Sequence, residues 1–138
     1  MGLLHALFTL EADFRPEAVR QRRGLRRMLQ APRQRTVLVA ERGGQIVGMV
    51  TAQLVISTAE GAPSAWIEDL IVAAPERGAG VGRRLLAAVQ AWAAARGATR
   101  CQLLADAANA PALGFYARLA WARTQLVCLR GPPRARRG

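Results

Sequence analysis

The sequence predicts an α/β (α+β) fold, with helices on both faces of a mixed, mostly antiparallel sheet. Two apolar runs, 36–41 and 46–57, flank a short Arg-Gly-Gly-Gln turn, a pattern typical of an antiparallel β-hairpin. Apolar runs at 65–72 and 100–105 enclose a helical pattern at 81–96, which predicts a right-handed crossover between parallel strands. Of the 138 residues, 51% are hydrophobic, enough to bury the core of one domain.

The individual elements follow from apolar spacing and from capping residues. A stripe of leucines predicts a helix at 2–11, and Pro16, which favours a first helical turn, begins a second helix. In the segment 81–96 apolar residues recur every three or four positions, as on one face of a helix. Asn109 and Pro111 are suited to the start of the next helix. We expect helices at 2–11, 16–30, 81–96 and 109–120, and strands at 36–41, 46–57, 65–72, 100–105 and 124–130.

The chain is strongly basic. All 20 of its basic residues are arginines, and against nine acidic residues they give a formal net charge of +11. Such a charge favours a polyanionic partner, either nucleic acid, acidic lipid or a phosphate-bearing cofactor, although a generally arginine-rich composition explains it equally well. We expect residues 1–130 to form a single domain and residues 131–138 to form a disordered basic tail.

Histidine and cysteine usage excludes several kinds of site. His5 is the only histidine and the two cysteines are far apart, so neither a histidine-based zinc site nor a Ser/His triad is expected. Cys101 and Cys128 lie in apolar runs, which favours small buried core residues in a reducing compartment. No apolar run approaches the roughly 20 residues that span a bilayer, and the first residues lack the features of a signal peptide. We therefore expect no metal and no membrane partner, and a cytoplasmic location.

A glycine-rich loop, Arg77-Gly-Ala-Gly-Val-Gly82, lies between the strand 65–72 and the helix 81–96. Amides in the first turn of a helix have no intrahelical acceptor, and the helix dipole adds partial positive charge there. Glycines let the backbone adopt positive φ and let a ligand approach it closely. The loop therefore predicts a phosphate-binding site, with charge-assisted contacts from Arg77 and Arg83.

Other interpretations of this loop fit less well. A P-loop requires a lysine, and the chain has none. The dinucleotide fingerprint GxGxxG requires another spacing than the GxGxG found here, and a tighter turn after the strand. The glycines could also serve only the close packing of the helix on the sheet, and the loop alone does not decide between packing and phosphate binding.

The segment "VAAPERGAGVGRRLL" resembles the pyrophosphate-binding segment of the GNAT superfamily of acyl-CoA-dependent N-acetyltransferases. The family's pattern, Gln/Arg-x-x-Gly-x-Gly/Ala, is matched by Arg77, Gly80 and Gly82. A second segment, "NAPALGFYARLAW", resembles the family's segment of Asn, Ala, an aromatic-Tyr pair and Gly-Phe, with Ala-Trp in place of Gly-Phe. The two segments together are more specific than either alone, and the resemblance covers about residues 36–130.

The chain departs from the family's pattern at its first strand. The family normally opens with a strand before its two helices, whereas the first element expected here is a helix. The first strand is thus expected to be missing, and either the sequence starts after that strand or another segment or subunit covers that edge of the sheet. Together with an expected edge strand at Gln125–Arg130, this makes a homodimer the expected assembly.

The resemblance implies that acetyl-CoA binds in a V-shaped gap where two central strands splay apart. Its pyrophosphate would rest on the amides of the glycine loop, and its pantetheine arm would pair with the preceding strand like an added strand. Asn109 would bond the pantetheine arm or only cap its own helix. The implied cofactor-binding residues are Leu70, Ile71, Val72, Arg77, Gly78, Ala79, Gly80, Val81, Gly82, Asn109 and Tyr116.

The implied reaction is the direct attack of a primary amine on the thioester, for which a base or a water relay must take the amine's proton. A carboxylate within an apolar central strand is costly unless it is used or paired, so Glu68 is the leading candidate and Asp69 its rival. On a regular strand, Trp66, Glu68 and Leu70 share one face and Asp69 points to the other. Tyr116, the only tyrosine, is by resemblance the general acid for the departing thiolate. A structural hydrogen-bonding role for Glu68 and a packing role for Tyr116 are the alternatives.

The acceptor is the least determined part of the expected site. By resemblance the first helices and the loop 57–64 line it, where Glu11, Asp13 and Glu60 would attract a cationic amine. The arginine-rich face of 20–27 is interpreted as a solvated helix face. A non-catalytic acyl-CoA-binding sensor or subunit is the alternative function, and no sequence motif supports a nucleic-acid binder. Fold does not fix the substrate, so the amine itself stays open.

Overall fold

A computed structural model describes residues 18–136 of the protein. The chain divides into two compact units, Met1–Leu104 and Ala105–Gly138, and each is described by itself. The helix expected at 2–11, the side chains of Glu11 and Asp13, and the expected lack of a strand before the first helices lie outside the described residues.

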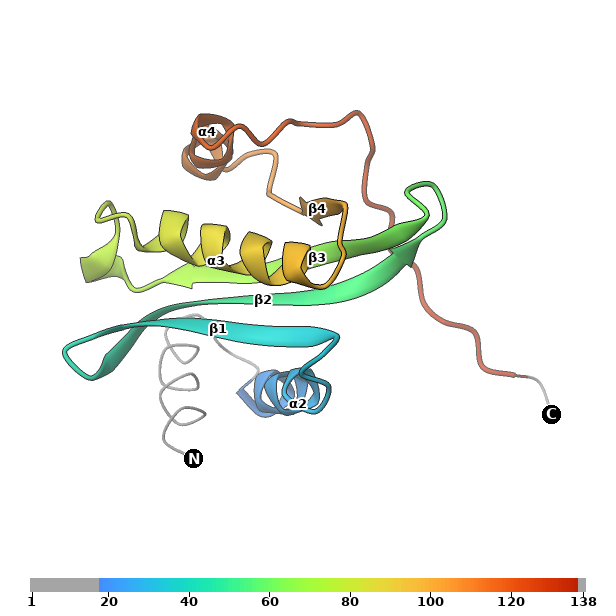
Figure 1. Cartoon of the computed structure of the whole chain (residues 1–138), viewed down its shortest axis with the longest axis horizontal. Coiled ribbons are helices and arrows are strands. Elements are labelled where there is room, and N and C mark those ends of the chain that lie inside the picture. Colours follow the sequence, from blue (N-terminus) through green and yellow to red (C-terminus); the bar gives the residue numbers. More distant parts are fainter. Residues whose placement is uncertain (1–17, 137–138) are drawn as a thin grey trace. The chain divides into compact units, whose positions relative to one another are not determined.

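The first unit is built around a four-stranded sheet with the strand order β1-β2-β3-β4 (Figure 1). The pairs β1/β2 and β2/β3 are antiparallel, whereas β3 and β4 are parallel. The predicted mixed, mostly antiparallel sheet is therefore confirmed. The elements of this unit are α2 (Ala18–Met28), β1 (Arg35–Arg42), β2 (Gln45–Ser57), β3 (Ala62–Val72), the 3-10 helix η1 (Ala74–Glu76), α3 (Val81–Ala95) and β4 (Arg100–Leu103).

Helices cover both faces of this sheet, as the sequence predicts. Successive residues of β2 point to opposite faces, yet residues 47–52 are all buried. On one face α3 packs so closely that a Cβ built on Gly48 would lie 3.0 Å from Leu85 Cδ1. On the other face Leu25 of α2 packs in a cluster with Met49. Figure 1 shows α3 and α2 on opposite sides of the strands.

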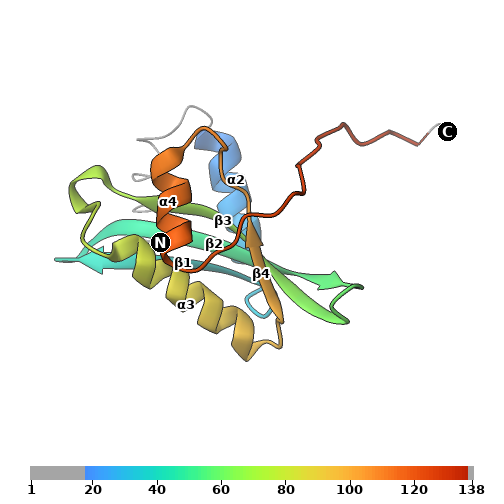
Figure 2. The same cartoon turned by 90° about the horizontal axis from the view of Figure 1, so that it is seen from above.

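The hairpin between β1 and β2 forms as expected because two glycines occupy its turn. Gly43 and Gly44 have φ values of 59° and 77°, the positive values required by the two-residue turns that suit the twist of a hairpin. The hairpin between β2 and β3 extends beyond the short strand β4, as Figure 2 shows from above. Strand β4 ends at Leu103 rather than at the expected residue 105.

The second unit contains the helix α4 (Ala110–Arg118). Asn109 is its N-cap, since its side-chain Oδ1 accepts a hydrogen bond from the amide of Ala112 at 3.2 Å. No residue from 121 to 136 lies in a helix or strand, and residues 131–136 are exposed.

The prediction of a strand at 124–130 is wrong. Within residues 105–136 the run has no strand to pair with, and an apolar pattern forms a strand only against a partner. As a result Leu126, Val127 and Leu129 are 87%, 79% and 89% exposed. The expectation of two buried cysteines is also wrong, because Cys128 in this run is exposed and Cys101 in β4 is only half-buried.

Two further observations bear on the function. Among the described residues, no helix combines the length and the apolar character that crossing a membrane requires. Within the same residues, no three His, Cys, Asp or Glu side chains gather where they could hold a metal ion.

Candidate active site

The glycine-rich loop connects β3 to α3 through the short helix η1. Gly78 and Gly80 have φ values of 82° and 85°, a backbone conformation that favours glycine. A Cβ on Gly78 would meet nothing within 4 Å, so backbone conformation rather than space requires glycine there. Gly80 is the N-cap of α3, which begins at Val81.

The backbone amides of this loop are open. Within residues 18–136, the amides of Gly78 to Arg83 donate to no protein acceptor, and the first one satisfied is that of Arg84, which bonds Gly80 O at 3.1 Å. The dipole of α3 adds partial positive charge at the same place. The guanidinium of Arg83 turns back toward the loop, with Nη2 3.8 Å from the position of a Cβ on Gly80. Open amides, a helix N-terminus and an arginine together favour an anion.

Two arginines hold the loop against the ends of strands. Arg77 Nε donates to the carbonyl oxygen of Val72, the last residue of β3, at 3.1 Å. Arg42 at the end of β1 forms an ion pair with Glu76 of η1, with 2.7 Å between Nε and Oε2. These two contacts hold the loop in place where it leaves β3, and this pre-organises its open amides.

Beyond its first half, β3 pairs with no other strand of residues 18–136 on the edge opposite β2, so its backbone edge is free there. Its last pair with β4 is Ile67 with Leu103, so residues 68–72 have no partner in β4. Ala73 donates to Val47 O at 2.8 Å and so faces β2. Because successive residues of a strand direct their polar groups to opposite edges, Val72 faces away from β2. Its carbonyl is taken by Arg77, which leaves its amide, and the edge before it, for a ligand.

Strand β3 carries a β-bulge at the two acidic residues. Thr51 opposes Glu68 and Met49 opposes Ile71, so β3 has one residue more than β2 in this stretch. Asp69 lies in the left-handed region with φ of 53°. The strand is therefore irregular here, and the expectation that simple alternation turns Glu68 and Asp69 to opposite faces is wrong.

The two carboxylates have different surroundings. Trp66 Nε1 donates to Glu68 Oε1 at 2.5 Å, which confirms that these side chains share a face and leaves Glu68 exposed. Thr51 Oγ1 lies 3.2 Å from Asp69 Oδ2 and 3.1 Å from the carbonyl oxygen of Glu68. Asp69 is also exposed as a residue, but partial desolvation of its carboxyl raises the pKa, the hydrogen bond from Thr51 opposes that rise, and the charge of Glu68 adds to it.

Tyr116 lies in the second unit, on α4. It is half-buried, and this burial raises the pKa of its phenol, which therefore keeps its proton at neutral pH. Its ring contacts that of Phe115 edge-on, with centroids 5.1 Å apart, and that of Trp121, with centroids 6.0 Å apart. The chain turns back at Ala120, where φ is 66°, and Trp121 N donates to Tyr116 O at 3.0 Å.

The sequence did not point to some of the polar partners in this region. Trp66 could have been anticipated, since it stands two residues before Glu68 on one strand. Thr51 could not, because its contact with Asp69 depends on the register of β2 and on the bulge. Glu60, expected near the acceptor, accepts a hydrogen bond from Thr99 Oγ1 at 3.0 Å.

Comparison with known proteins agrees with this fold. The model of the Acetyltransferase (GNAT) family matches residues 4–121. Curated proteins give no significant match. A transcriptional regulator from Bacillus halodurans C-125 superposes with a TM-score of 0.80 at 24% identity, over 95% of this chain and 93% of that one.

Two acetyltransferases of known structure are also similar. The aminoglycoside acetyltransferase HMB0005, from an uncultured soil metagenomic sample, has a TM-score of 0.70 at 28% identity, over 87% of this chain and 76% of its own. AAC(6')-Iy, in complex with the bisubstrate analog CoA-S-monomethyl-acetylneamine, has a TM-score of 0.78 at 20% identity, over 94% and 91%. The chain therefore belongs to the GNAT family of acetyltransferases and is an acyltransferase.

Proposed function

We propose that the protein transfers the acetyl group of acetyl-CoA to a primary amine, of a small molecule or a protein, by direct attack of the amine. The observation that carries the proposal is the row of open amides from Gly78 to Arg83 at the end of a strand whose outer edge is free. GNAT enzymes use acetyl-CoA, and this backbone has the features to receive its two polar parts.

The open amides would hold the pyrophosphate of acetyl-CoA, with charge-assisted contacts from Arg77 and Arg83. The pantetheine arm would pair with the free edge of β3, using the amide of Val72 and the backbone of Leu70. Ile71 faces β2 by alternation, so we propose that it supports the strand rather than bonding the arm. Asn109 would offer its side-chain NH₂, because its Oδ1 caps α4.

The reaction forms a C–N bond and breaks the C–S bond of the thioester. The amine attacks through its lone pair, so its extra proton must go to a base. We assign that role to Glu68, which is exposed and is oriented by Trp66. The departing thiolate takes a proton, and we assign its donor as Tyr116, whose phenol is protonated at neutral pH.

Asp69 is the second candidate for the base. Its raised pKa brings the carboxyl closer to the operating pH, which favours proton transfer. The substitutions Glu68→Gln and Asp69→Asn separate the two, since each removes one carboxylate with little change in shape. Loss of kcat by about 100-fold or more is expected for the residue that takes the proton.

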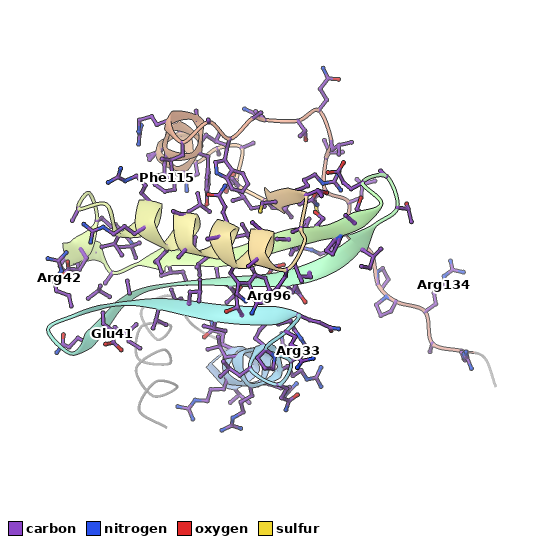
Figure 3. All side chains as sticks on the ribbon, viewed as in Figure 1. Arg33, Glu41, Arg42, Arg96, Phe115 and Arg134 are labelled. Carbon is purple, nitrogen blue, oxygen red and sulfur yellow. The ribbon has the colours of Figure 1, made fainter. Side chains whose placement is uncertain are left out.

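Thiol release from acetyl-CoA in the presence of a panel of primary amines tests the proposal. We expect turnover with at least one amine, and a strongly reduced kcat in Glu68→Gln and in Tyr116→Phe. Glu41→Gln is the matched control, because Glu41 is an exposed acid of β1 outside the proposed site (Figure 3). A full rate in Tyr116→Phe would remove the assigned acid, and thermal stabilisation by coenzyme A without release for any amine would identify a sensor instead.

A cytoplasmic location and a homodimer also belong to this proposal. The strand on which the dimer was expected is not formed, but its residues Leu126, Val127 and Leu129 expose apolar side chains, which favours association. Light scattering after size-exclusion chromatography should give twice the mass of one chain. A monomer across the accessible concentration range would contradict the dimer.

A further inference from the structure

We propose that the acceptor amine carries an anionic group, a phosphate or a carboxylate, and that Arg35 binds it on the sheet face that bears Glu68. This inference rests on the proposed function, because it deepens the description of the same site.

The amine must approach Glu68 from one face of the sheet. Residues that pair directly across neighbouring strands point to the same face, so Glu68 lies on the face of Thr51. Met49, two residues before Thr51 on β2, packs with Leu25 of α2. The amine therefore arrives on the α2 side of the sheet, and groups beside Glu68 on this side meet the rest of the acceptor.

Two residues along the strands from Glu68, a row of polar side chains crosses this face of the sheet. Arg35 pairs with Gln53, Gln53 with Trp66, and Trp66 with Gln102, so one residue from each of the four strands contributes. All four side chains are half-buried rather than covered. Within residues 18–136, no side-chain hydrogen bond or ion pair engages Arg35, Gln53 or Gln102. Trp66 Nε1 is taken by Glu68, so the groups of this row that are open to a ligand are those of Arg35, Gln53 and Gln102.

The charges around this row are positive away from Glu68. Arg33, which is exposed, lies beside the start of β1 at the level of α2 (Figure 3). Arg100, at the other edge of the sheet, donates to Ser57 Oγ at 3.2 Å and approaches Ser64 Oγ at 3.5 Å. Among residues 18–136, Glu68 and Asp69 lie at the reacting end, and Glu60, near Arg100, accepts a hydrogen bond from Thr99. A second cation on the acceptor would meet repulsion at the arginines, whereas an anion would gain a charge-assisted hydrogen bond.

The spacing limits the length of the acceptor. Arg35 lies two strands from Glu68 and two residues along them, so their Cα atoms are about 12 Å apart at ordinary strand spacing. Both side chains point out of the same face and shorten this gap. A flexible amine with an anionic group about six carbons away therefore reaches both ends.

The test uses amines that differ only in their distal group: 6-aminohexyl phosphate, 6-aminohexanoate, 6-aminohexanamide and 1,6-diaminohexane. With acetyl-CoA saturating, we expect kcat/KM at least about tenfold higher for an anionic member than for the amide, and lowest for the diamine. Comparison of the phosphate with the carboxylate identifies which anion the site takes. In the variant Arg35→Gln, the ratio of kcat/KM for the anionic amine to kcat/KM for the amide, which is the anion preference, should fall toward one. The main cause should be a higher KM for the anionic amine. Arg96→Gln is the matched control, since Arg96 is the C-cap of α3 and its guanidinium lies over Trp92, so the anion preference of this variant should not change.

A diamine acetylated as well as the anionic amines, or an anion preference that survives in Arg35→Gln, would overturn the inference. If no member of the series is acetylated, calorimetric binding of 6-aminohexyl phosphate to the protein loaded with coenzyme A decides. Binding that Arg35→Gln abolishes would support the anion subsite and count against the proposed transfer reaction. No binding would overturn the subsite itself, whether or not coenzyme A binds.

Discussion

Helix α3 packs tightly against the sheet at Gly48, and replacing this glycine by alanine tests how α3 is positioned. The added Cβ would lie 3.0 Å from Leu85 Cδ1, 3.1 Å from Ile71 O and 3.2 Å from Val81 Cγ1. The Leu85 methyl group can rotate away, but the backbone oxygen of Ile71 cannot. Outward movement of α3 relieves the contacts with Leu85 and Val81, and it displaces the start of the helix, where the open amides lie.

Overpacking of this kind costs about 2 kcal/mol of unfolding free energy, which for a chain of this size lowers Tm by roughly 8 °C. We also expect coenzyme A to stabilise Gly48→Ala less than the unaltered protein, because the displaced helix presents its amides less well. Urea denaturation and thermal melts, each with and without coenzyme A, measure both effects.

Gly24→Ala is the matched control. Gly24 lies inside α2 with nothing within 4 Å of its added Cβ, so the same substitution should raise stability by about 0.5–1 kcal/mol. If Gly48→Ala is as stable as the unaltered protein while Gly24→Ala behaves as expected, the tight packing of α3 on the sheet is refuted.

Three further substitutions test other parts of the account. Arg77→Gln removes a guanidinium from the glycine loop and should weaken coenzyme A binding by about tenfold or more in calorimetry; an unchanged affinity would leave Arg77 with a purely structural role. Asp69→Asn should raise stability at neutral pH, because a carboxyl whose pKa is raised in the folded state destabilises that state when ionised. This gain should shrink as the pH is lowered through the raised pKa toward 3.8, and a gain that is constant with pH would contradict the burial of its charge. Gln21→Met should stabilise the protein by about 1 kcal/mol in urea denaturation, since the buried Oε1 of Gln21 accepts no hydrogen bond from the described residues; a loss would show that this oxygen has a partner in solution.

The parts of the fold that local chemistry determines were predictable from the sequence. Gly43 and Gly44 supply the positive φ values of the hairpin turn, and Gly78 and Gly80 supply those of the loop before α3. Asn109 caps α4 through its own side chain. In each case the residue type itself specifies the backbone conformation, so no knowledge of distant partners was required.

The parts that depend on pairing between strands were not predictable. The bulge that brings Thr51 to Asp69 arises because β3 has one residue more than β2 in that stretch, and a single sequence does not show strand register. The polar row from Arg35 to Gln102 has the same origin. The run 124–130 shows the opposite error, since its apolar pattern suited a strand but its unit offers no partner.

The binding of a diphosphate by the backbone amides of the glycine loop is the central claim, and amide NMR measures it directly. In a titration of ¹⁵N-labelled protein with coenzyme A, the amide signals of Gly78 to Arg83 should shift and saturate together with that of Val72, while those of the exposed residues Gly131, Arg134, Ala135 and Arg136 stay unchanged. If coenzyme A stabilises the protein thermally but the signals of Gly78 to Arg83 do not move at saturating concentration, the pyrophosphate does not bind at this loop and the account is contradicted.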